Sequence, residues 1–119
     1  MIKQWIQYRG RKRPGLMPGT KVGLMTAEVG ADGNIHIGWA SWHPKKDAYS
    51  LKKIEQVALG RMRTTDRPIR TWKDTTGKIH DPVASYMKEP LNIFIRRAAK
   101  YFKGANLDQR TVDLATHIE

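Results

Sequence analysis

The residues best suited to chemistry are aromatic, basic and acidic side chains at separated points of the chain. Trp72 lies close to Arg70 and Lys73, and Asp108 and Arg110 stand two positions apart, which places them on one face of an extended segment. An aromatic ring and a guanidinium plane can sandwich a purine, a carboxylate can accept its amino group, and arginines bind phosphate bidentately. These residue types point to a phosphate-bearing nucleotide. The alternative is structural, with Trp72 in the core and Asp108 and Arg110 as a surface pair.

The chain lacks the sequence patterns of common catalytic and metal sites. It contains no His-Glu-x-x-His, no Walker loop, no Gly-x-Ser-x-Gly and no Gly-x-Gly-x-x-Gly. Its carboxylates are scattered among turn segments, so a paired-carboxylate nuclease site would depend on the fold gathering them. We therefore expect a binding protein rather than an enzyme, with no catalytic residue, metal or cofactor.

The net charge indicates an anionic partner. The 119 residues include 22 Lys and Arg against 11 Asp and Glu, a formal charge of +11. Such a surplus repels itself in a compact domain and attracts anions, so nucleic acid, nucleotides and acidic membranes are candidates. An evenly basic surface that only aids solubility is the alternative. The absence of cysteine and of any long apolar run predicts a cytoplasmic protein that does not enter a membrane and is stabilised by packing or self-association.

A second set of basic residues supports an alternative function. The segment 9–19 begins Arg9-Gly10-Arg11, an order that suits an extended hook in a narrow minor groove, and Pro14 makes it a loop. With the basic face of a helix over 90–104, it could bind DNA or RNA regardless of sequence. A solvated loop is the structural alternative. The basic residues of this second site are Arg9, Arg11, Lys12, Arg13, Arg63 and Arg67.

Turn and alternation patterns predict one small α+β domain spanning residues 1–119. A strand is expected at the N-terminus, and the turn residues 30–33 predict a β-hairpin over 21–42. Within it, Ile35, Ile37 and Trp39 share a core face, while the half-apolar opposite face could meet a partner. A second, smaller hairpin is expected over 69–80.

Helical spacing completes the expected fold. Ser50 can cap a helix over 50–60 that Gly60 would end, and Pro90 would separate a short helical turn from the helix over 90–104. The tail 105–119 fits either a strand or a helix. We expect a small antiparallel sheet with two or three helices packed on one face.

Three short segments resemble a pattern found in small bacteriophage proteins. An arginine after the first helix, an aromatic residue further on and Asp-x-Arg near the C-terminus follow in the same order. This order resembles the Thoeris anti-defence sponges, which sequester cyclic ADP-ribose isomers and, in some members, cyclic oligonucleotide signals made by host immune enzymes. The segments are Ile37-Gly38-Trp39-Ala40-Ser41, Pro44-Lys45-Lys46-Asp47-Ala48-Tyr49-Ser50 and Ala58-Leu59-Gly60-Arg61.

The resemblance implies a ligand and the residues that would hold it. Trp72 and Arg110 would sandwich an adenine, Asp108 would hold its edge, and Arg61 with Arg97 would bind the pyrophosphate. It further implies a homo-oligomer with ligand sites at subunit interfaces, acting without turnover in the cytoplasm of an infected bacterium.

Overall fold

A three-stranded antiparallel sheet forms the centre of the fold. The computed structural model describes residues 1–43, 48–64 and 69–119. The strand order is β1-β2-β3, and each strand alternates between two faces as the sequence pattern predicts. The strands are β1 (Ile2–Gln7), β2 (Lys21–Val29) and β3 (Ile35–Ser41).

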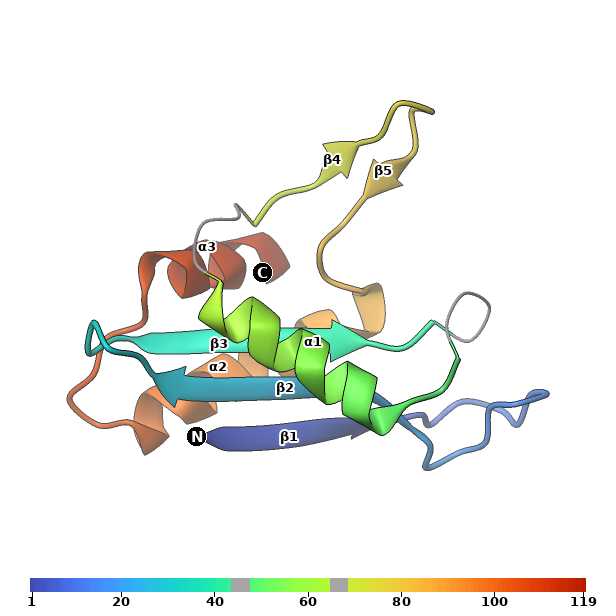
Figure 1. Ribbon diagram of the computed structural model, residues 1–119, viewed down its shortest axis with the longest axis horizontal. Helices are drawn as coiled ribbons and strands as arrows, with labels where there is room; N and C mark the ends of the chain where they lie inside the picture. Colours follow the sequence, from blue (N-terminus) through green and yellow to red (C-terminus); the bar gives the residue numbers. More distant parts are fainter. Residues whose placement is uncertain (44–47, 65–68) are drawn as a thin grey trace.

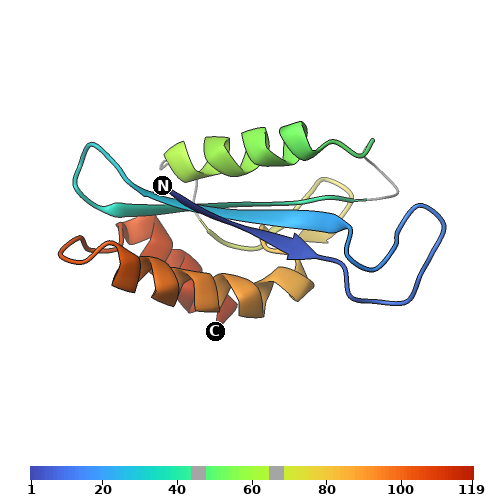
Figure 2. The same cartoon turned by 90° about the horizontal axis from the view of Figure 1, so that it is seen from below.

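Helices cover both faces of this sheet, and a small hairpin projects from it (Figure 1). Figure 2 shows α1 on one side and α2 with α3 on the other. In the described part of the chain, no helix has the length and apolar character that crossing a bilayer requires. The remaining elements are α1 (Leu51–Arg63), β4 (Trp72–Lys73), β5 (Ile79–His80), η1 (Ser85–Met87), α2 (Lys88–Tyr101) and α3 (Gln109–Ile118).

The face that carries α1 depends on one glycine. A Cβ atom at Gly38 would lie 2.5 Å from Met62 Cβ and 2.6 Å from Met62 N, because the helix backbone rests almost directly on β3. Leu24, Ala40 and Ala58 pack around this contact and are almost completely buried. The α+β class and the antiparallel sheet are confirmed, but the helices are not confined to one face. The sheet face that we expected to be open to a partner is covered by α1.

The opposite face holds the larger core. Ile35, Ile37 and Trp39 contact the apolar stripe of α2, including Leu91 and Phe94, and all five side chains are buried. This is the core face predicted from alternation in β3. Because both faces are buried, the central strands have almost no solvent-exposed side, unlike an antiparallel sheet with one wet face.

The two edges of the sheet differ. Along the outer edge of β3, Ile35 N donates to Asn106 O at 2.8 Å and Asp108 N donates to Ile35 O at 3.0 Å. Further along the same edge, Trp39 O accepts from Arg61 Nη1 at 3.0 Å. In the described residues β1 pairs with β2 only, so the chain covers one sheet edge and leaves the other unpaired.

Two helices have bounds that differ from the sequence expectation, and the structure decides between the two alternatives for the tail. The first helix continues past Gly60 to Arg63 because that glycine has ordinary helical geometry and Thr64 N closes the last turn on Gly60 O. Pro90 lies in the first turn of α2, where its missing N–H is not needed, so it does not separate two helices. The tail forms α3, which Asp108 caps.

Substituting Gly38 should test the contact between α1 and the sheet. We expect Gly38→Ala to lower the free energy of unfolding by at least about 2 kcal/mol, since the new methyl group must displace helix backbone. Gly60→Ala is the matched control, because no atom lies within 4 Å of its added Cβ. In a helix interior that change should stabilise by roughly 0.5–1 kcal/mol. Urea unfolding of both variants measures the difference, and equal stabilities would contradict the close packing.

Asp81 ties together the elements that follow the hairpin. Its Oδ1 atom lies 2.8 Å from His117 Nε2 of α3 and accepts from Val83 N at 2.9 Å, while Oδ2 lies 2.9 Å from Lys88 Nζ at the start of α2. Burial opposes ionisation, but these hydrogen bonds outweigh it and lower the pKa of Asp81 to about 2. The ionised carboxylate therefore stabilises the packing of α3 beside α2.

The lowered pKa of Asp81 predicts an acid-sensitive contribution to stability. That contribution is complete above the ordinary carboxyl pKa of 3.8 and is lost as the pH falls towards about 2. Asp81→Asn should be less stable than the natural chain at neutral pH, and should lose less stability between about pH 5 and pH 2.5. Urea unfolding at both pH values measures this, and parallel losses in the two proteins would contradict the role of Asp81.

Candidate functional site

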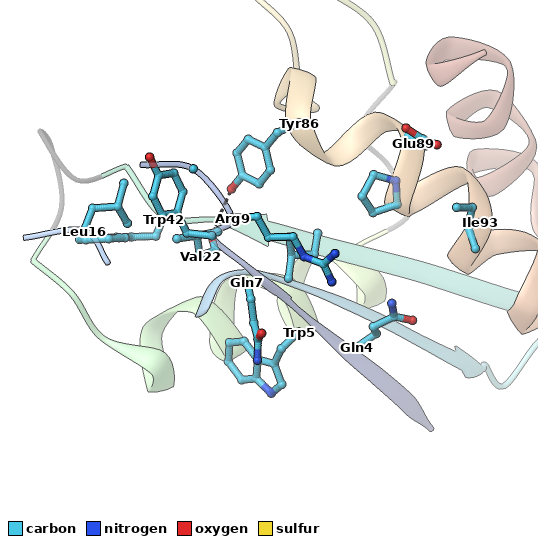
Figure 3. Close-up of a pocket in the computed structure, with 14 residues that line it drawn as sticks. Gln4, Trp5, Gln7, Arg9, Leu16, Val22, Trp42, Tyr86, Glu89 and Ile93 are labelled. Carbon is cyan, nitrogen blue, oxygen red and sulfur yellow. Dashed lines mark hydrogen bonds between the residues drawn. The ribbon is translucent and has the colours of Figure 1, made fainter. Parts of the chain in front are cut away.

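A cavity of about 750 Å³ lies beside β1 (Figure 3). Four aromatic rings line it, from Trp5, Tyr8, Trp42 and Tyr86. Its volume is in the range of about 300–1,000 Å³ that small-molecule sites occupy. Its aromatic lining can bind a flat ring.

Separate parts of the chain bring these rings together. Trp5 lies on β1 and Tyr8 directly follows that strand, whereas Trp42 follows β3 and Tyr86 belongs to η1. The antiparallel pairing of β2 with both outer strands carries the ends of β1 and β3 to the same end of the sheet. The segment η1 then places Tyr86 over that end, where its hydroxyl donates to Val22 O at 3.1 Å.

Hydrogen bonds and ring contacts fix the orientation of the aromatic lining. Trp42 meets Tyr49 edge to face at 4.7 Å between ring centroids, and the Tyr49 hydroxyl donates to Lys21 O at 2.9 Å. Lys21 Nζ lies 5.2 Å from the centroid of the Trp5 ring. Burial raises the pKa of Tyr86, so its phenol stays protonated and acts as a donor at neutral pH. The rings are thus held in place before any ligand arrives.

The polar groups of the cavity combine one cation, two amides and one carboxylate. Figure 3 shows the Arg9 side chain extending among the lining residues, with Gln4, Gln7 and Glu89 nearby. The Gln4 side chain is positioned by Arg97, whose Nη1 donates to Gln4 Oε1 at 2.9 Å. Donors and acceptors for a polar ligand therefore accompany the aromatic rings.

The basic loop 9–19 continues from the cavity into solvent. Arg11, Lys12 and Arg13 are exposed, as the sequence predicts for a solvated basic loop. A tight turn closes it, with mutual hydrogen bonds of 2.9 Å between the backbones of Arg13 and Leu16. The positive φ of 74° at Gly15 allows this turn. The loop places several positive charges next to the aromatic cavity.

Arg61 and Arg110, two of the predicted ligand residues, join the two helical layers at the β3 edge. Arg61 on α1 donates to Trp39 O, and Arg110 Nη1 on α3 donates to Arg61 O at 2.7 Å. The Arg110 guanidinium carbon lies 5.4 Å from the centroid of the Trp39 ring. We call this arrangement of Arg61, Trp39 and Arg110 the edge clasp. Its contacts are those of a structural element.

Asp108 is also engaged in structure. Its Oδ1 atom accepts from Thr111 N at 2.9 Å and caps α3, while Oδ2 lies 2.9 Å from His36 Nδ1. The other ring nitrogen of His36 lies 2.9 Å from Asp32 Oδ1. The side chain is 8 % exposed, so the predicted contact with a purine edge would require breaking the cap or the His36 pair.

The remaining predicted ligand residues do not join this group. Trp72 belongs to β4 of the projecting hairpin that Figure 1 shows; it is 53 % exposed and stacks on His80. Arg97 lies on α2 and holds Gln4 at the cavity. Among the described residues of one chain, the predicted sandwich of Trp72 and Arg110 is therefore not assembled, because each ring or guanidinium plane has a different neighbour.

The second predicted set divides in a similar way. Arg9 lines the cavity and the neighbouring loop residues lie beside it, whereas Arg63 forms an ion pair with Glu28 at 3.2 Å. Arg67 lies outside the described residues, as does the segment 44–47 of the phage-protein pattern. No group of three or more His, Asp or Glu in the described ranges is arranged to hold a metal ion.

The aromatic cavity was not predicted from the sequence. Its rings come from four segments, and only Tyr8 with Arg9 places an aromatic and a basic residue side by side. The alternation in β1 indicates that Trp5 and Gln7 share a face, but not that Trp42 or Tyr86 would approach it. The pair Tyr8-Arg9, directly after the first strand, is the one feature of the local sequence that indicates this site.

Comparisons with known proteins identify no relative: no family model, curated protein or solved structure matches the chain.

The role of Asp108 can be tested by comparing it with another carboxylate on the same helix. Asp108→Ala should lower the free energy of unfolding by about 1–2 kcal/mol, because it removes the helix cap and leaves His36 without one partner. Asp113→Ala is the control, because its exposed carboxylate accepts from the exposed Gln109 Nε2 at 2.9 Å. We expect the control to change stability by less than about 0.5 kcal/mol. Equal effects in urea unfolding would argue against the structural role of Asp108.

Proposed function

We propose that the chain captures a phosphate-bearing nucleotide in the aromatic cavity and holds it without chemical turnover. The observation that carries this proposal is the meeting of four aromatic rings with Arg9 around one hollow of about 750 Å³. Flat rings bind a nucleobase by stacking, and a guanidinium binds phosphate with paired hydrogen bonds. The net charge of +11 favours the same class of ligand.

Each polar group of the cavity has a distinct part in this proposal. Arg9 would bind the phosphate, while Gln4 and Gln7 would offer amide donors and acceptors to the base edge. Arg97, predicted as a phosphate ligand, would instead orient the Gln4 amide through its existing hydrogen bond. The Tyr86 hydroxyl already donates to Val22 O, so Tyr86 would contribute its ring face at the rim.

Binding without turnover is supported by the chemistry of the lining residues. Glu89 is the single carboxylate among them, and no histidine lines the cavity in the described residues. General acid–base catalysis of phosphodiester cleavage commonly uses two titratable groups on opposite sides of the bond. His36, His80 and His117 each lie against a carboxylate elsewhere in the fold.

The sequence resemblance supports a specific ligand class. The phage-protein pattern points to sponges of cyclic immune signals, so we propose a cyclic ADP-ribose isomer or a cyclic oligonucleotide as the ligand. The cell would be an infected bacterium, and the site its cytoplasm. In this proposal the aromatic cavity takes the place of the Trp72 and Arg110 sandwich, and the resemblance implies a homo-oligomer.

Sequence-tolerant binding of DNA or RNA is the second candidate, favoured by the exposed cations of the basic loop and of α2. The basic loop adjoins the cavity, and Arg96, Lys100 and Lys103 are exposed further along α2 or just after it, while the first turns of that helix line the cavity. A nucleic acid strand could follow these cations while one base enters the cavity. Both candidate functions use contacts to a base and a phosphate. They differ in whether these groups belong to a small cyclic nucleotide or to a nucleic acid strand.

Titration calorimetry with two probes tests the proposal and separates the sources. The probes are cyclic ADP-ribose or cyclic di-AMP, and a single-stranded oligodeoxythymidine. For capture of a small nucleotide, Arg9→Ala should weaken the cyclic probe by about 10-fold to 100-fold, the effect of losing a charged hydrogen-bond pair. Arg13→Ala, in the loop but outside the cavity lining, should leave that affinity unchanged.

The remaining outcomes decide between the candidates. The second candidate is correct if three results occur together. Only the oligonucleotide binds, both arginine variants weaken that binding, and the affinity falls steeply with salt. If neither probe binds to the natural chain, both are wrong. Mass spectrometry of the recovered cyclic probe should show it unchanged, and a cleaved product would contradict binding without turnover.

A further inference from the structure

The projecting hairpin carries an exposed ring stack well away from the cavity lining. Trp72 on β4 pairs across the hairpin with His80 on β5, and their rings lie nearly parallel, with centroids 4.3 Å apart and an interplanar angle of 16°. The Trp72 side chain is 53 % exposed, although one ring face is covered by His80. Its exposed area therefore lies largely on the opposite face, which a further flat ring could cover.

The carboxylate of Asp74 holds this stack in place. Asp74 Oδ2 lies 2.8 Å from His80 Nε2, and Oδ1 accepts from Thr76 Oγ1 at 2.6 Å, Thr76 N at 2.9 Å and Lys78 N at 3.0 Å. These bonds, first from Thr76 and then from His80, hold the pKa of Asp74 far below its ordinary value. The carboxylate thus remains ionised and fixes both the turn and the imidazole. The imidazole in turn supports the indole.

Positive charge surrounds the stack. Arg70, Lys73 and Lys78 are all exposed, and none of the three forms an ion pair with another described residue. The nearby carboxylate of Asp74 is fully engaged in the turn. A ring face bordered by free cations repels cationic ligands such as quaternary ammonium groups and attracts aromatic groups attached to anions. Nucleobases on a phosphate backbone have this chemistry.

The open shape of the hairpin further restricts the class of ligand that could bind there. Two strands of two residues each enclose nothing, so a bound ring would be covered on one face only. One base–aromatic stack contributes about 1–3 kcal/mol, which is too little to retain a free mononucleotide at low concentration. A strand with several phosphates adds contacts to the cations. In a duplex the bases are already stacked on each other, so the ligand must be single-stranded.

We propose that the Trp72–His80 stack is a platform for an unpaired base of single-stranded DNA or RNA, with Arg70, Lys73 and Lys78 contacting the adjoining phosphates. Asp74 and His80 are positioning residues that set the plane of the indole. This site does not depend on nucleotide capture in the aromatic cavity. It also differs from the expected sandwich, because His80 rather than Arg110 backs the indole.

Fluorescence anisotropy of a labelled 20-residue oligodeoxythymidine tests the platform in the full chain. Trp72→Ala should weaken binding by about 5-fold to 100-fold, the loss of one stacked base. Trp72→Phe keeps a flat ring and should recover most of the affinity. Quenching of tryptophan fluorescence by an unlabelled oligonucleotide should be present in the natural chain and strongly reduced in Trp72→Phe, which a merely structural role would not produce.

Two controls separate the loss of a stacking ring from unfolding and from a general effect of truncating the surface. Because the indole is exposed, Trp72→Ala should shift the melting temperature by less than about 2 °C, so lost affinity cannot be assigned to unfolding. Val57→Ala, a smaller truncation of an exposed apolar side chain on α1, should leave binding unchanged. Asp74→Asn should weaken binding less than Trp72→Ala, since the ring remains but its support loosens.

Three results would overturn the platform. These are unchanged affinity in Trp72→Ala, equal affinity for a duplex of the same length, and no binding of the oligonucleotide by the natural chain. The cyclic probe measured on the same Trp72→Ala protein distinguishes the two proposals. If Trp72→Ala still binds the cyclic probe but no longer binds the oligonucleotide, both sites are supported. If it loses the cyclic probe but still binds the oligonucleotide, the platform is not independent of the cavity.

Discussion

The structure depends on the direct contact between α1 and the backbone of β3 at Gly38. With no side chain there, the helix lies close enough for Ala58 and Met62 to pack on the strand itself. This closeness fixes the position of the last helical turn, and from there Arg61 reaches the carbonyl of Trp39. The carbonyl of Arg61 then anchors Arg110 from the other face. The absence of a side chain at Gly38 thereby helps to set the positions of α1 and α3, which lie on opposite faces of the sheet.

The basic side chains of the protein fall into two groups in this arrangement. Some cations are used internally, as in the edge clasp and in the pairs Lys3–Glu55 and Lys88–Asp81. Others, in the loop after β1 and on the projecting hairpin, stand in solvent beside exposed or partly exposed rings. The nucleotide binding proposed above depends on the cations near aromatic rings rather than on the total charge.

Local patterns predicted much of the fold and little of the site. The alternation of Ile35, Ile37 and Trp39 indicated a core face correctly because both the period and the burial are properties of one strand. The helix over 90–104 was found from the apolar stripe around Leu91 and Phe94, with boundaries shifted because Pro90 suits a first turn. Such features depend on neighbours in the chain, which a sequence displays directly.

The site residues depend instead on contacts between distant segments. Asp108 was predicted as a ligand group from its residue type and Arg61 from the resemblance. In the structure Arg61 bonds to a strand edge and Asp108 caps a helix, contacts that the sequence did not indicate. The aromatic cavity joins residues up to Tyr86 with Trp5, and no spacing rule connects them. Charged residue types thus indicated a ligand class, while their positions were decided by backbone groups that needed hydrogen bonds.

The unequal edges of the sheet bear on how molecules of this chain could aggregate. Strand-to-strand growth into a fibre needs two receptive sides on every molecule, so that each newcomer offers a fresh template. Here the backbone of residues 106–108 and the Arg61 guanidinium occupy the β3 side. Any pairing through β1 would end after a second molecule joined, because both outward sides of that pair would be closed. Growth by strand pairing through the three-stranded sheet would therefore stop at two molecules.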